Sequence, residues 1–311
     1  MTTGSARSLV IGSRGSDLAL WQAKFVQQML GIPTTIKVIK TSGDTIQHLS
    51  LDKVEGKGFF TKEIELALLS RQIDIAVHSL KDLPTEDVDG LRIGAIPPRA
   101  SALDVLIVRK DAQLQDTGKQ PLRRNARIGT SSLRRQAHLK TIRPDIELVG
   151  IRGNVPTRIE KIQGMALDGI ILAQAGVERL GEHLSGVLSA YDVVPLAPEL
   201  ICPAPGQGAL GIQIRTEDQH ALRYVKPLHC ENTSMSVSAE RGLLAKFGGG
   251  CHLPLGCLCR PQKQGYSFHA VIASIEPLQR LTASAASDSI TALIEETHHK
   301  LVEQGAAELL G

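Results

Sequence analysis

The stretch IDIAVHSLKD, residues 73–82, reads as a short apolar strand that runs into a lysine and an aspartate. Before it, apolar runs at 9–12 and 34–40 predict two more strands, and amphipathic stretches at 16–31 and 61–71 predict two helices. Strands that alternate with helices in this way form a mostly parallel or mixed sheet covered by helices. The first hundred residues therefore predict one α/β unit.

The helix at 16–31 has the clearest ends of these elements. Ser16 is a typical N-cap residue, and Gly31 is a typical stop because glycine adopts the left-handed conformation at little cost. Between them, Leu18, Trp21 and Phe25 recur at helical spacing. We expect this stripe to pack against the sheet.

The same alternation restarts further along the chain and predicts a second α/β unit. Its expected elements are strands at 127–130, 147–151 and 169–173, a helix from Ser132 and a helix near 157–162. A later apolar run, 208–214, is expected to be a strand that returns to the first sheet. Residues from about 227 onward predict a smaller α+β unit.

Prolines at the ends of these units mark the expected boundaries: Pro97, Pro98, Pro195, Pro198, Pro203 and Pro205. At 311 residues the chain exceeds the roughly 100 to 200 residues of a typical domain. The predicted fold class is α/β, with two α/β domains and a smaller C-terminal α+β domain. The predicted domains are 1–98 together with 204–224, then 103–198, and last 228–311.

The composition excludes several classes of protein. With 35 Lys and Arg against 32 Asp and Glu, the net charge of +3 is too small for wholesale binding of nucleic acid or a membrane surface. Aromatic residues, at 3%, are too few to build stacking platforms for single strands. No apolar run approaches the ~18 residues that span a bilayer, and residues 1–8 do not resemble a signal peptide. We therefore expect a cytoplasmic protein that binds neither nucleic acid nor membrane.

Cationic side chains follow the predicted strands, where ligands bind in open α/β sheets. Residues 129–135, GTSSLRR, open a helix and offer backbone amides, three hydroxyls and two guanidinium groups. Arg14, Arg152, Arg158 and Arg179 follow other strands. Guanidinium groups bind carboxylates in a planar, bidentate way, so the pattern predicts a ligand with several carboxylates. The alternative, an N-cap cluster beside solvated surface arginines, stays open.

One cysteine stands out among Cys202, Cys230, Cys251, Cys257 and Cys259. An odd number of cysteines without a secretion signal does not predict structural disulfides. Cys251 follows three glycines, and such a backbone can approach a bulky group closely. A buried free cysteine is the ordinary alternative. A metal site is a second one, but the spacings lack the paired C-x-x-C of structural zinc, so we expect no metal.

Five short motifs occur in order along the chain: HSLKDLP at 78–84, GTSSLRR at 129–135, RGN at 152–154 followed by Arg158, GQGA at 206–209 and GGC at 249–251. Together they resemble the signatures of the porphobilinogen deaminases, a family also called hydroxymethylbilane synthases. The resemblance covers nearly the whole chain. It implies two domains of the periplasmic-binding-protein type with the active cleft between them, and a C-terminal domain that presents a cysteine.

The resemblance implies a transferase of porphyrin and haem biosynthesis. Such an enzyme condenses four porphobilinogen molecules, with loss of ammonia, onto a dipyrromethane cofactor, and hydrolysis then releases the linear tetrapyrrole hydroxymethylbilane. Cys251 would carry the cofactor through a thioether, because a thiolate can attack an electrophilic methylene carbon. Each pyrrole bears two carboxylates, which agrees with the arginines at the strand ends.

The family's functional positions carry over to this chain residue by residue. Asp82 matches the catalytic carboxylate, and Lys81 lies beside it. Cofactor binding is implied for Cys251, Lys81, Asp82, Thr130, Ser131, Ser132, Arg134 and Arg135. Binding of substrate or of the growing chain is implied for Arg14, Ser16, Lys57, Arg152, Arg158, Arg179 and Gln207, with Lys57 expected on a mobile loop.

The chain departs from the family pattern at Gly248, where a glutamate is common, at Leu253, where a β-branched residue is usual, and at the variable position Pro156. The resemblance gives no role to Cys257 and Cys259. It suggests a monomer that hands its product to uroporphyrinogen III synthase.

Two other functions stay open on the sequence alone. One is a non-catalytic two-lobed binding protein for a polyanionic small molecule, and the other is a zinc-dependent regulatory protein. Asp82 and Cys251 favour the enzyme, because a binding protein requires neither.

Overall fold

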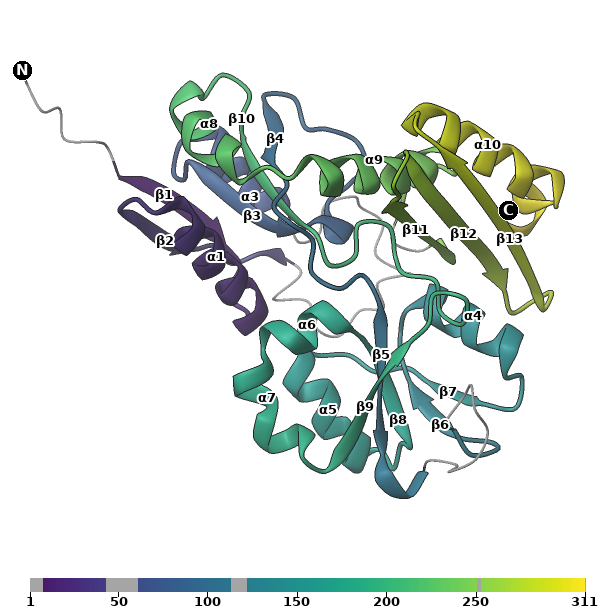
Figure 1. Ribbon diagram of the computed structural model, residues 1–311. Coiled ribbons are helices and arrows are strands. Elements are labelled where there is room, and N and C mark those ends of the chain that lie inside the picture. Colours follow the sequence, from purple (N-terminus) through teal and green to yellow (C-terminus); the bar gives the residue numbers. More distant parts are fainter. Residues whose placement is uncertain (1–7, 43–60, 113–121, 251–252, 311) are drawn as a thin grey trace, which may run out of the picture. The chain divides into compact units, whose positions relative to one another are not determined.

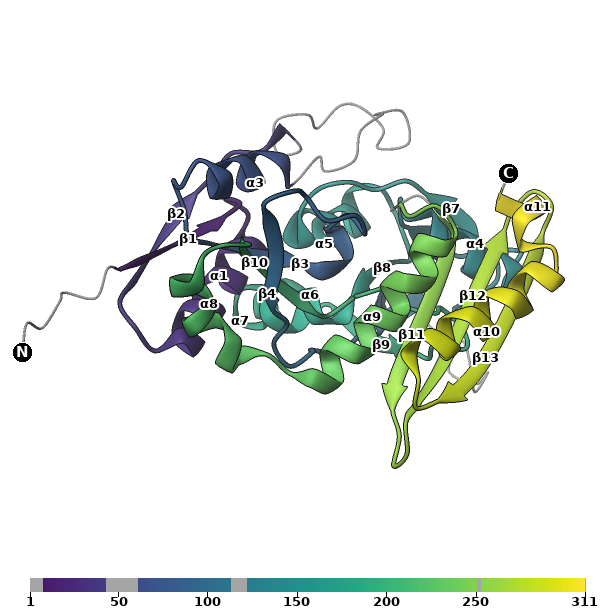
Figure 2. The same cartoon turned by 90° about the horizontal axis from the view of Figure 1, so that it is seen from above.

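The computed structural model describes residues 8–42, 61–112, 122–250 and 253–310 (Figures 1 and 2). They form two compact units. Unit 1 contains the described parts of Met1–Arg99 and Ala209–Ser234, and unit 2 contains those of Ala100–Gly208 and Met235–Gly311. Each unit has a five-stranded mixed sheet, and unit 2 also has a three-stranded antiparallel sheet. The α/β class with a smaller C-terminal α+β part is confirmed.

The sheet of unit 1 has the order β2-β1-β3-β10-β4. Its strands are β1 (Leu9–Ser13), β2 (Thr34–Val38), β3 (Ile75–Ser79), β4 (Leu91–Ala95) and β10 (Leu210–Arg215). The first strand lies parallel to both β2 and β3, whereas β10 lies antiparallel to β3 and β4. The strand predicted at 208–214 is therefore part of this sheet.

Helices cover both faces of this sheet. On one face, α1 (Asp17–Leu30) and α8 (Gln219–Val225) share an apolar cluster with β1, β3 and β10. On the other face, α3 (Lys62–Leu69) contributes Ile64 and Leu68 to a second cluster with Ile73 and Leu91. The two layers of helix bury the strands from both sides, which explains why Ile75, Ala76 and Val77 on β3 are apolar without alternation.

The first helix begins and ends as its sequence predicts, but its buried side differs. Ser16 accepts a hydrogen bond from the Ala19 amide at 3.3 Å, and Gly31 has the left-handed φ of 62°. The buried side is centred on Ala23 and Val26, whereas Trp21 and Phe25 stack beside it with ring centroids 5.2 Å apart. The expected stripe therefore flanks the core instead of forming its centre.

The five-stranded sheet of unit 2 has the order β7-β6-β8-β5-β9. Its strands are β5 (Asp104–Arg109), β6 (Arg127–Gly129), β7 (Glu147–Val149), β8 (Gly169–Ala173) and β9 (Tyr191–Leu196). The strand β6 is parallel to β7 and β8, and β5 is antiparallel to β8 and β9. Its helices are α4 (Leu133–Ile142), α5 (Val155–Gly164), α6 (Gln174–Arg179) and α7 (Gly181–Leu188).

The sequence predicts a linker at Pro195, but this residue lies inside β9. A proline cannot donate to a strand ladder, so it is tolerated mainly in edge strands. β9 is the edge strand of this sheet, which explains the difference.

The C-terminal part of unit 2 is the three-stranded sheet β11 (Leu255–Pro261), β12 (Tyr266–Ser274) and β13 (Gln279–Ser287). The helices α9 (Glu231–Lys246), α10 (Ile290–Glu303) and α11 (Ala306–Leu310) accompany it, and Figure 1 shows α10 running along the sheet. Leu243, Phe268 and Leu293 lie at the centre of its core. The helix α4 of the larger sheet contacts β12 and β13. The division of the chain into three domains stays a prediction.

The buried His78 on β3 makes the stability of unit 1 depend on pH. Burial lowers the pKa of this imidazole from 6.5 to about 4, although its hydrogen bond of 3.1 Å to Gln213 opposes the shift. Below about pH 6.5 this imidazole therefore binds a proton in the unfolded chain but not in the folded chain, so the free energy of unfolding falls as the pH falls toward 4. Between about pH 7 and pH 5, His78 alone should cost about 2 kcal/mol of unfolding free energy.

Urea unfolding of His78→Gln at the two pH values checks this expectation. Glutamine can replace the hydrogen bond but does not titrate, so the acid-induced fall should shrink by about 2 kcal/mol. The exposed His183 on α7 provides the matched control, since His183→Gln should leave the fall unchanged. A His78→Gln protein that lost stability as steeply as the parent would contradict the assignment.

Candidate active site

Lys81 and Asp82 lie in a single 3₁₀ turn, Leu80–Asp82, directly after β3. Two apolar residues fix this turn, because Leu80 and Leu83 are both buried and the Leu80 amide donates to the Ala209 carbonyl at 3.0 Å. The side chain of Lys81 is half-buried and that of Asp82 is exposed. Within the described part of the chain, the Asp82 carboxylate has no hydrogen bond or ion pair, so it is accessible to a ligand.

Arg14 and Ser16 follow β1, the parallel neighbour of β3. The carboxyl ends of parallel strands meet at one edge of a sheet, so these residues and Asp82 lie beyond the same edge in unit 1. Ser13 holds the connection in place, since its hydroxyl donates to the Arg14 and Ala19 carbonyls at 3.1 and 3.0 Å. The Ser16 hydroxyl caps α1 as an acceptor, which leaves its own hydrogen for a ligand.

The hydroxyl cluster in unit 2 lies where β6 gives way to α4. Thr130 is buried, and its hydroxyl accepts from the Ser132 amide at 3.2 Å. The Ser131 hydroxyl donates to the Ile151 carbonyl at 2.8 Å. Ser132 is the N-cap residue of α4, but its side chain makes no capping hydrogen bond. The helix therefore begins with a hydroxyl that is available beside the positive end of the helix dipole.

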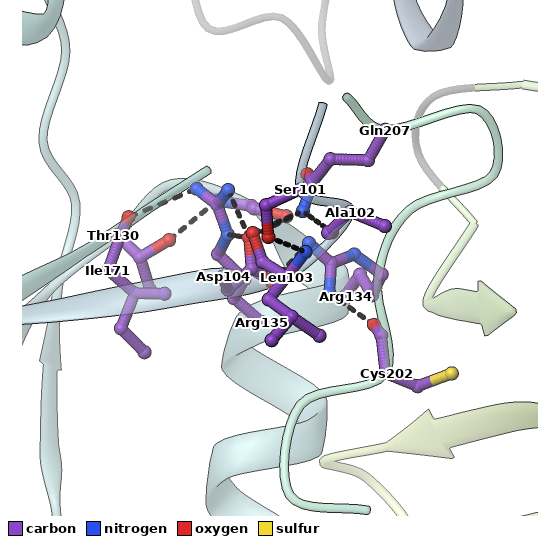
Figure 3. A network of polar contacts seen from close by, with 11 residues as sticks. Ser101, Ala102, Leu103, Asp104, Thr130, Arg134, Arg135, Ile171, Cys202 and Gln207 are labelled. Carbon is purple, nitrogen blue, oxygen red and sulfur yellow. Dashed lines mark hydrogen bonds and ion pairs between the residues drawn. The ribbon is translucent and has the colours of Figure 1, made fainter. Parts of the chain in front are cut away.

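Arg134 and Arg135 are almost completely buried, and both meet the carboxylate of Asp104 (Figure 3). Arg134 Nη2 lies 2.8 Å from Asp104 Oδ2, and its Nη1 donates to the Cys202 carbonyl. Arg135 donates to Asp104 Oδ1 through Nε at 3.2 Å and Nη2 at 2.7 Å, and to the Ile171 carbonyl at 3.0 Å. The two guanidinium groups thus share one internal carboxylate.

The charges of this cluster do not balance. Burial would raise the pKa of Asp104, but the adjacent Arg134 and Arg135 hold it well below the usual range of an aspartate, so Asp104 is ionised. Two guanidinium groups beside one carboxylate leave an excess of one positive charge. In addition, Arg134 Nε is buried without a hydrogen-bond partner in the described structure. A buried donor of this kind is costly unless a further acceptor meets it, and a ligand carboxylate has the required charge.

The remaining arginines of unit 2 lie near the ends of β7 and β8. Arg152 and Arg158 are half-buried on either side of Gly153, whose carbonyl accepts from Arg158 Nε at 2.7 Å. Arg179 ends α6, and its Nη2 donates to the Gly208 carbonyl at 2.8 Å. Burial lowers the pKa of Arg179 to about 10, which still leaves it charged at neutral pH.

Gln207 lies in a tight turn between two glycines of positive φ, Gly206 at 71° and Gly208 at 85°. Its side chain is fully buried, and Nε2 donates to the Ala102 carbonyl at 2.7 Å and to Asp104 Oδ1 at 2.9 Å. A Cβ atom at Gly208 would lie 2.5 Å from the Ser101 carbonyl oxygen, so this position requires glycine.

Two predicted site residues, Lys57 and Cys251, lie outside the described residues. The three glycines before Cys251 all have positive φ: Gly248 at 89°, Gly249 at 60° and Gly250 at 152°. This backbone gives a reason for the glycine at 248, because side chains rarely adopt that conformation.

The remaining cysteines and histidines do not gather around a metal in the part of the chain that the structure describes. There, no three His, Cys, Asp or Glu side chains are placed to hold a metal ion together. The thiols of Cys257 and Cys259 are buried in the core of the C-terminal sheet.

Sequence reasoning missed Asp104 and Glu240, two fully buried carboxylates in unit 2. Glu240 accepts hydrogen bonds from the amides of Gly206 at 2.7 Å and Cys259 at 3.0 Å. A signal for Asp104 is its place at the start of the apolar run VLIV, 105–108, where a buried strand needs a partner for any charge. Glu240 lies inside a helix and gives no comparable signal.

The fold and these side chains define an α/β protein that has arginine and hydroxyl side chains near the strand ends of its units and an exposed carboxylate after β3 in unit 1. Residues 9–223 match the family model described as "Porphobilinogen deaminase, dipyromethane cofactor binding domain". Over 313 residues the chain is 44% identical to a porphobilinogen deaminase of Syntrophomonas wolfei, covering 98% of each. A porphobilinogen deaminase of Moorella thermoacetica is 40% identical over 307 residues, covering 96% of this chain and 95% of its own. The chain belongs to the porphobilinogen deaminase family.

Among solved structures, the chain is similar in part to two arginine-binding periplasmic proteins. The one from Salmonella typhimurium has a TM-score of 0.38 and 14% identity, covering 72% of this chain and 92% of its own. The one from Legionella pneumophila has a TM-score of 0.39 and 12% identity, covering 71% and 91%. No functional conclusion follows from likeness at this level.

Proposed function

We propose that this chain is a hydroxymethylbilane synthase that condenses four porphobilinogen molecules on a dipyrromethane held by Cys251. Membership of the family over nearly the full length carries the proposal. In each condensation, the aminomethyl carbon of one pyrrole loses ammonia and forms a carbon–carbon bond to a free ring carbon of another, which loses a proton. Water then releases the linear tetrapyrrole.

Asp82 is the proposed catalytic residue. When ammonia leaves with its electron pair, the substrate becomes a cation, and attack by the next ring produces a second cation. A carboxylate beside them stabilises both and can accept the proton that the ring carbon loses. The exposure of Asp82 on the rigid turn after β3 suits this role, and Lys81 is proposed to assist it.

The donors around the start of α4 fit a cofactor that carries carboxylates. An anionic group would accept hydrogen bonds from two donors here: the Ser132 hydroxyl, which makes no capping hydrogen bond, and Arg134 Nε, which has no partner in the described structure. It would also balance the excess positive charge of Arg134 and Arg135. When bound, the dipyrromethane supplies the free ring position to which the first porphobilinogen is added. We propose that its carboxylates are held by Lys81, Thr130, Ser131, Ser132, Arg134 and Arg135, with Asp82 beside its rings.

The other cationic and polar positions are proposed to hold incoming porphobilinogen or the growing chain: Arg14, Ser16, Lys57, Arg152, Arg158, Arg179 and Gln207. Of these, the arginines near the strand ends of unit 2 are half-buried, so their guanidinium groups can reach both protein and solvent. Each added pyrrole brings two more carboxylates, and several arginines are needed to compensate them.

Arginine variants should separate cofactor assembly from elongation. Arg152→Leu and Arg158→Leu each remove charge-assisted hydrogen bonds worth roughly 1.5 to 3 kcal/mol, so elongation should slow by about tenfold to a hundredfold with little loss of stability. Arg134→Leu and Arg135→Leu should instead lower the fraction of folded protein that carries the cofactor. Intact mass and single-turnover addition measure the two effects. Four variants that loaded and elongated like the parent would refute the assignment of the arginines.

The proposed function is tested by incubating purified protein with porphobilinogen and measuring both products. An enzyme releases four ammonia molecules for each hydroxymethylbilane detected by mass spectrometry. A binding protein for a polyanion would take up porphobilinogen without releasing ammonia, and that result would overturn the proposal.

Within the described residues, no helix combines the length and the apolar character that crossing a membrane would require. We infer that the protein works in the cytoplasm as a monomer and passes its product to uroporphyrinogen III synthase. Sedimentation of the purified protein with and without that synthase would test the last two points.

A further inference from the structure

We propose that Asp104 is a positioning residue, which orients the guanidinium groups of Arg134 and Arg135 and leaves the three-residue cluster with one positive charge in excess. The inference rests on the proposed function, because it assigns the uncompensated charge to a carboxylate of the bound cofactor. Asp104 itself touches neither substrate nor cofactor in this account. It acts only through the two arginines.

The geometry gives Asp104 control over both guanidinium groups. It is the first residue of β5, it has no solvent exposure, and each of its oxygens accepts from a different arginine. Arg134 and Arg135 are neighbours on α4, so their side chains would repel each other without this shared anion. In addition, Arg134 donates to the Cys202 carbonyl and Arg135 donates to the Ile171 carbonyl, so a second acceptor holds each guanidinium group. Both arginines are therefore fixed before any ligand arrives.

The orientation leaves particular donors for a ligand. In the described structure, Arg134 uses one hydrogen on each terminal nitrogen, while its Nε is buried without a partner. A neutral side chain nearby cannot supply the negative charge that would balance the second guanidinium group. His138, one turn along α4, has its pKa held well below 6.5 by burial and by the nearby Arg134, so it carries no charge that would change the balance at neutral pH. One ligand carboxylate would make the cluster neutral.

The turn at Gly206–Gly208 also holds the Asp104 carboxylate in place. The Gln207 amide donates to Asp104 Oδ1 at 2.9 Å, which holds the carboxylate in one rotamer. The Gly206 amide in turn donates to Glu240, which also accepts from Cys259 on β11. These hydrogen bonds, together with the backbone of Gly206 and Gln207 that links them, connect the C-terminal sheet to the two arginines within unit 2.

A buried ion pair can also be purely structural, and unit 1 contains a suitable comparison. Asp74 is buried, and its Oδ1 lies 2.9 Å from Nη2 of Arg215, which also donates to the Leu68 and Ile73 carbonyls. Like the Asp104 cluster, this pair joins a buried aspartate to an arginine that also donates to carbonyl oxygens, but Arg215 pairs with Asp218 as well and so leaves no positive charge in excess. Asp74→Asn is therefore the matched control for a loss of stability that does not affect the ligand.

The experiment compares Asp104→Asn, Asp104→Glu and Asp74→Asn. Apo-protein of each is incubated with a series of porphobilinogen concentrations, and intact mass gives the fraction that has acquired the cofactor. For Asp104→Asn we expect the half-loading concentration to rise by roughly tenfold to a hundredfold, since a misplaced charged group near a reacting centre has effects of this size. Asp74→Asn should load like the parent, even where thermal unfolding shows a similar loss of stability.

The glutamate variant separates charge from shape. Asparagine keeps the shape of Asp104 and removes its charge, whereas glutamate keeps the charge and adds a methylene to a buried site. If Asp104 only fills space, Asp104→Glu should load worse than Asp104→Asn. The positioning role predicts the reverse order.

Other outcomes have definite meanings. Equal half-loading concentrations for Asp104→Asn and the parent would overturn the inference. A parent protein that never acquires the mass of the cofactor would instead overturn the proposed function. Should Asp104→Asn fail to fold, Gln207→Met removes the hydrogen bond to Oδ1 together with that to the Ala102 carbonyl, and it leaves both ion pairs of Asp104 in place. The half-loading concentration should then rise about threefold. No rise would again overturn the inference.

Discussion

Replacing Asp82 by asparagine should leave cofactor and substrate binding largely intact while the addition of porphobilinogen nearly stops. Asparagine keeps the shape and a hydrogen-bond acceptor, but it removes the negative charge and the ability to relay a proton. Loss of general acid–base catalysis costs about 10² to 10⁴-fold, and the lost stabilisation of two cations should bring the effect to the upper end or beyond. Because Asp82 is exposed and has no partner in the described structure, stability should not change.

The measurement is single-turnover addition to protein that was loaded with cofactor before the assay. Loading first separates the chemical step from assembly of the cofactor. Asp82→Glu serves as the control, since it keeps the charge and misplaces it by one methylene, and it should retain more activity than Asp82→Asn. An asparagine variant that elongated within about tenfold of the parent would show that another group carries the reaction.

Cys251→Ser should yield a folded protein that has no covalent cofactor and no turnover. A serine hydroxyl is a far weaker nucleophile than a thiolate and cannot form the thioether. We expect a loss of all measurable activity, because elongation has no attached chain to extend. Intact mass and unfolding curves together check that the cofactor, and not the fold, is missing.

The buried thiols of the C-terminal sheet provide the controls for this experiment. Cys257→Ala and Cys259→Ala change buried thiols in the core, so they should lower stability somewhat and leave cofactor loading intact. A Cys251→Ser protein that still carried the cofactor covalently would rule out the attachment site.

Local signals were sufficient for much of the fold. The ends of α1 follow from Ser16 and Gly31, and the strand β8 has the predicted bounds of residues 169–173. These predictions succeeded because capping and apolar runs are determined by neighbouring residues. In contrast, Pro195 indicated a linker but lies in β9, since only the sheet order shows that this strand is at the edge.

The buried side of α1 shows a second limit of local reasoning. Gln22 is polar, so helical periodicity assigns it to the surface, yet it is buried and donates to the Ser79 hydroxyl at 2.9 Å. A partner 57 residues away determines its place. Periodicity therefore predicted that the stripe of Trp21 and Phe25 packs against the sheet, whereas the structure places Gln22, Ala23 and Val26 at the centre of the buried side.

The candidate site was predictable from the sequence in its residue types but not in their pairing. The motif at 129–135 indicated an anion site, and the structure places Thr130, Ser132 and Arg134 around the start of α4. Nothing in that motif reveals that Arg134 and Arg135 share Asp104, which precedes them by 30 and 31 residues. Long-range ion pairs depend on the sheet topology, which a linear motif does not contain.

The most direct test of the proposed function is the intact mass of the purified protein with its sequence unchanged. We predict an excess over the sequence mass equal to one dipyrromethane, and after proteolysis this excess should remain on the peptide that contains Cys251. Addition of porphobilinogen should then produce further species, each heavier by one substrate less one ammonia. A protein of unmodified sequence mass that stays unmodified after incubation with porphobilinogen would contradict the account.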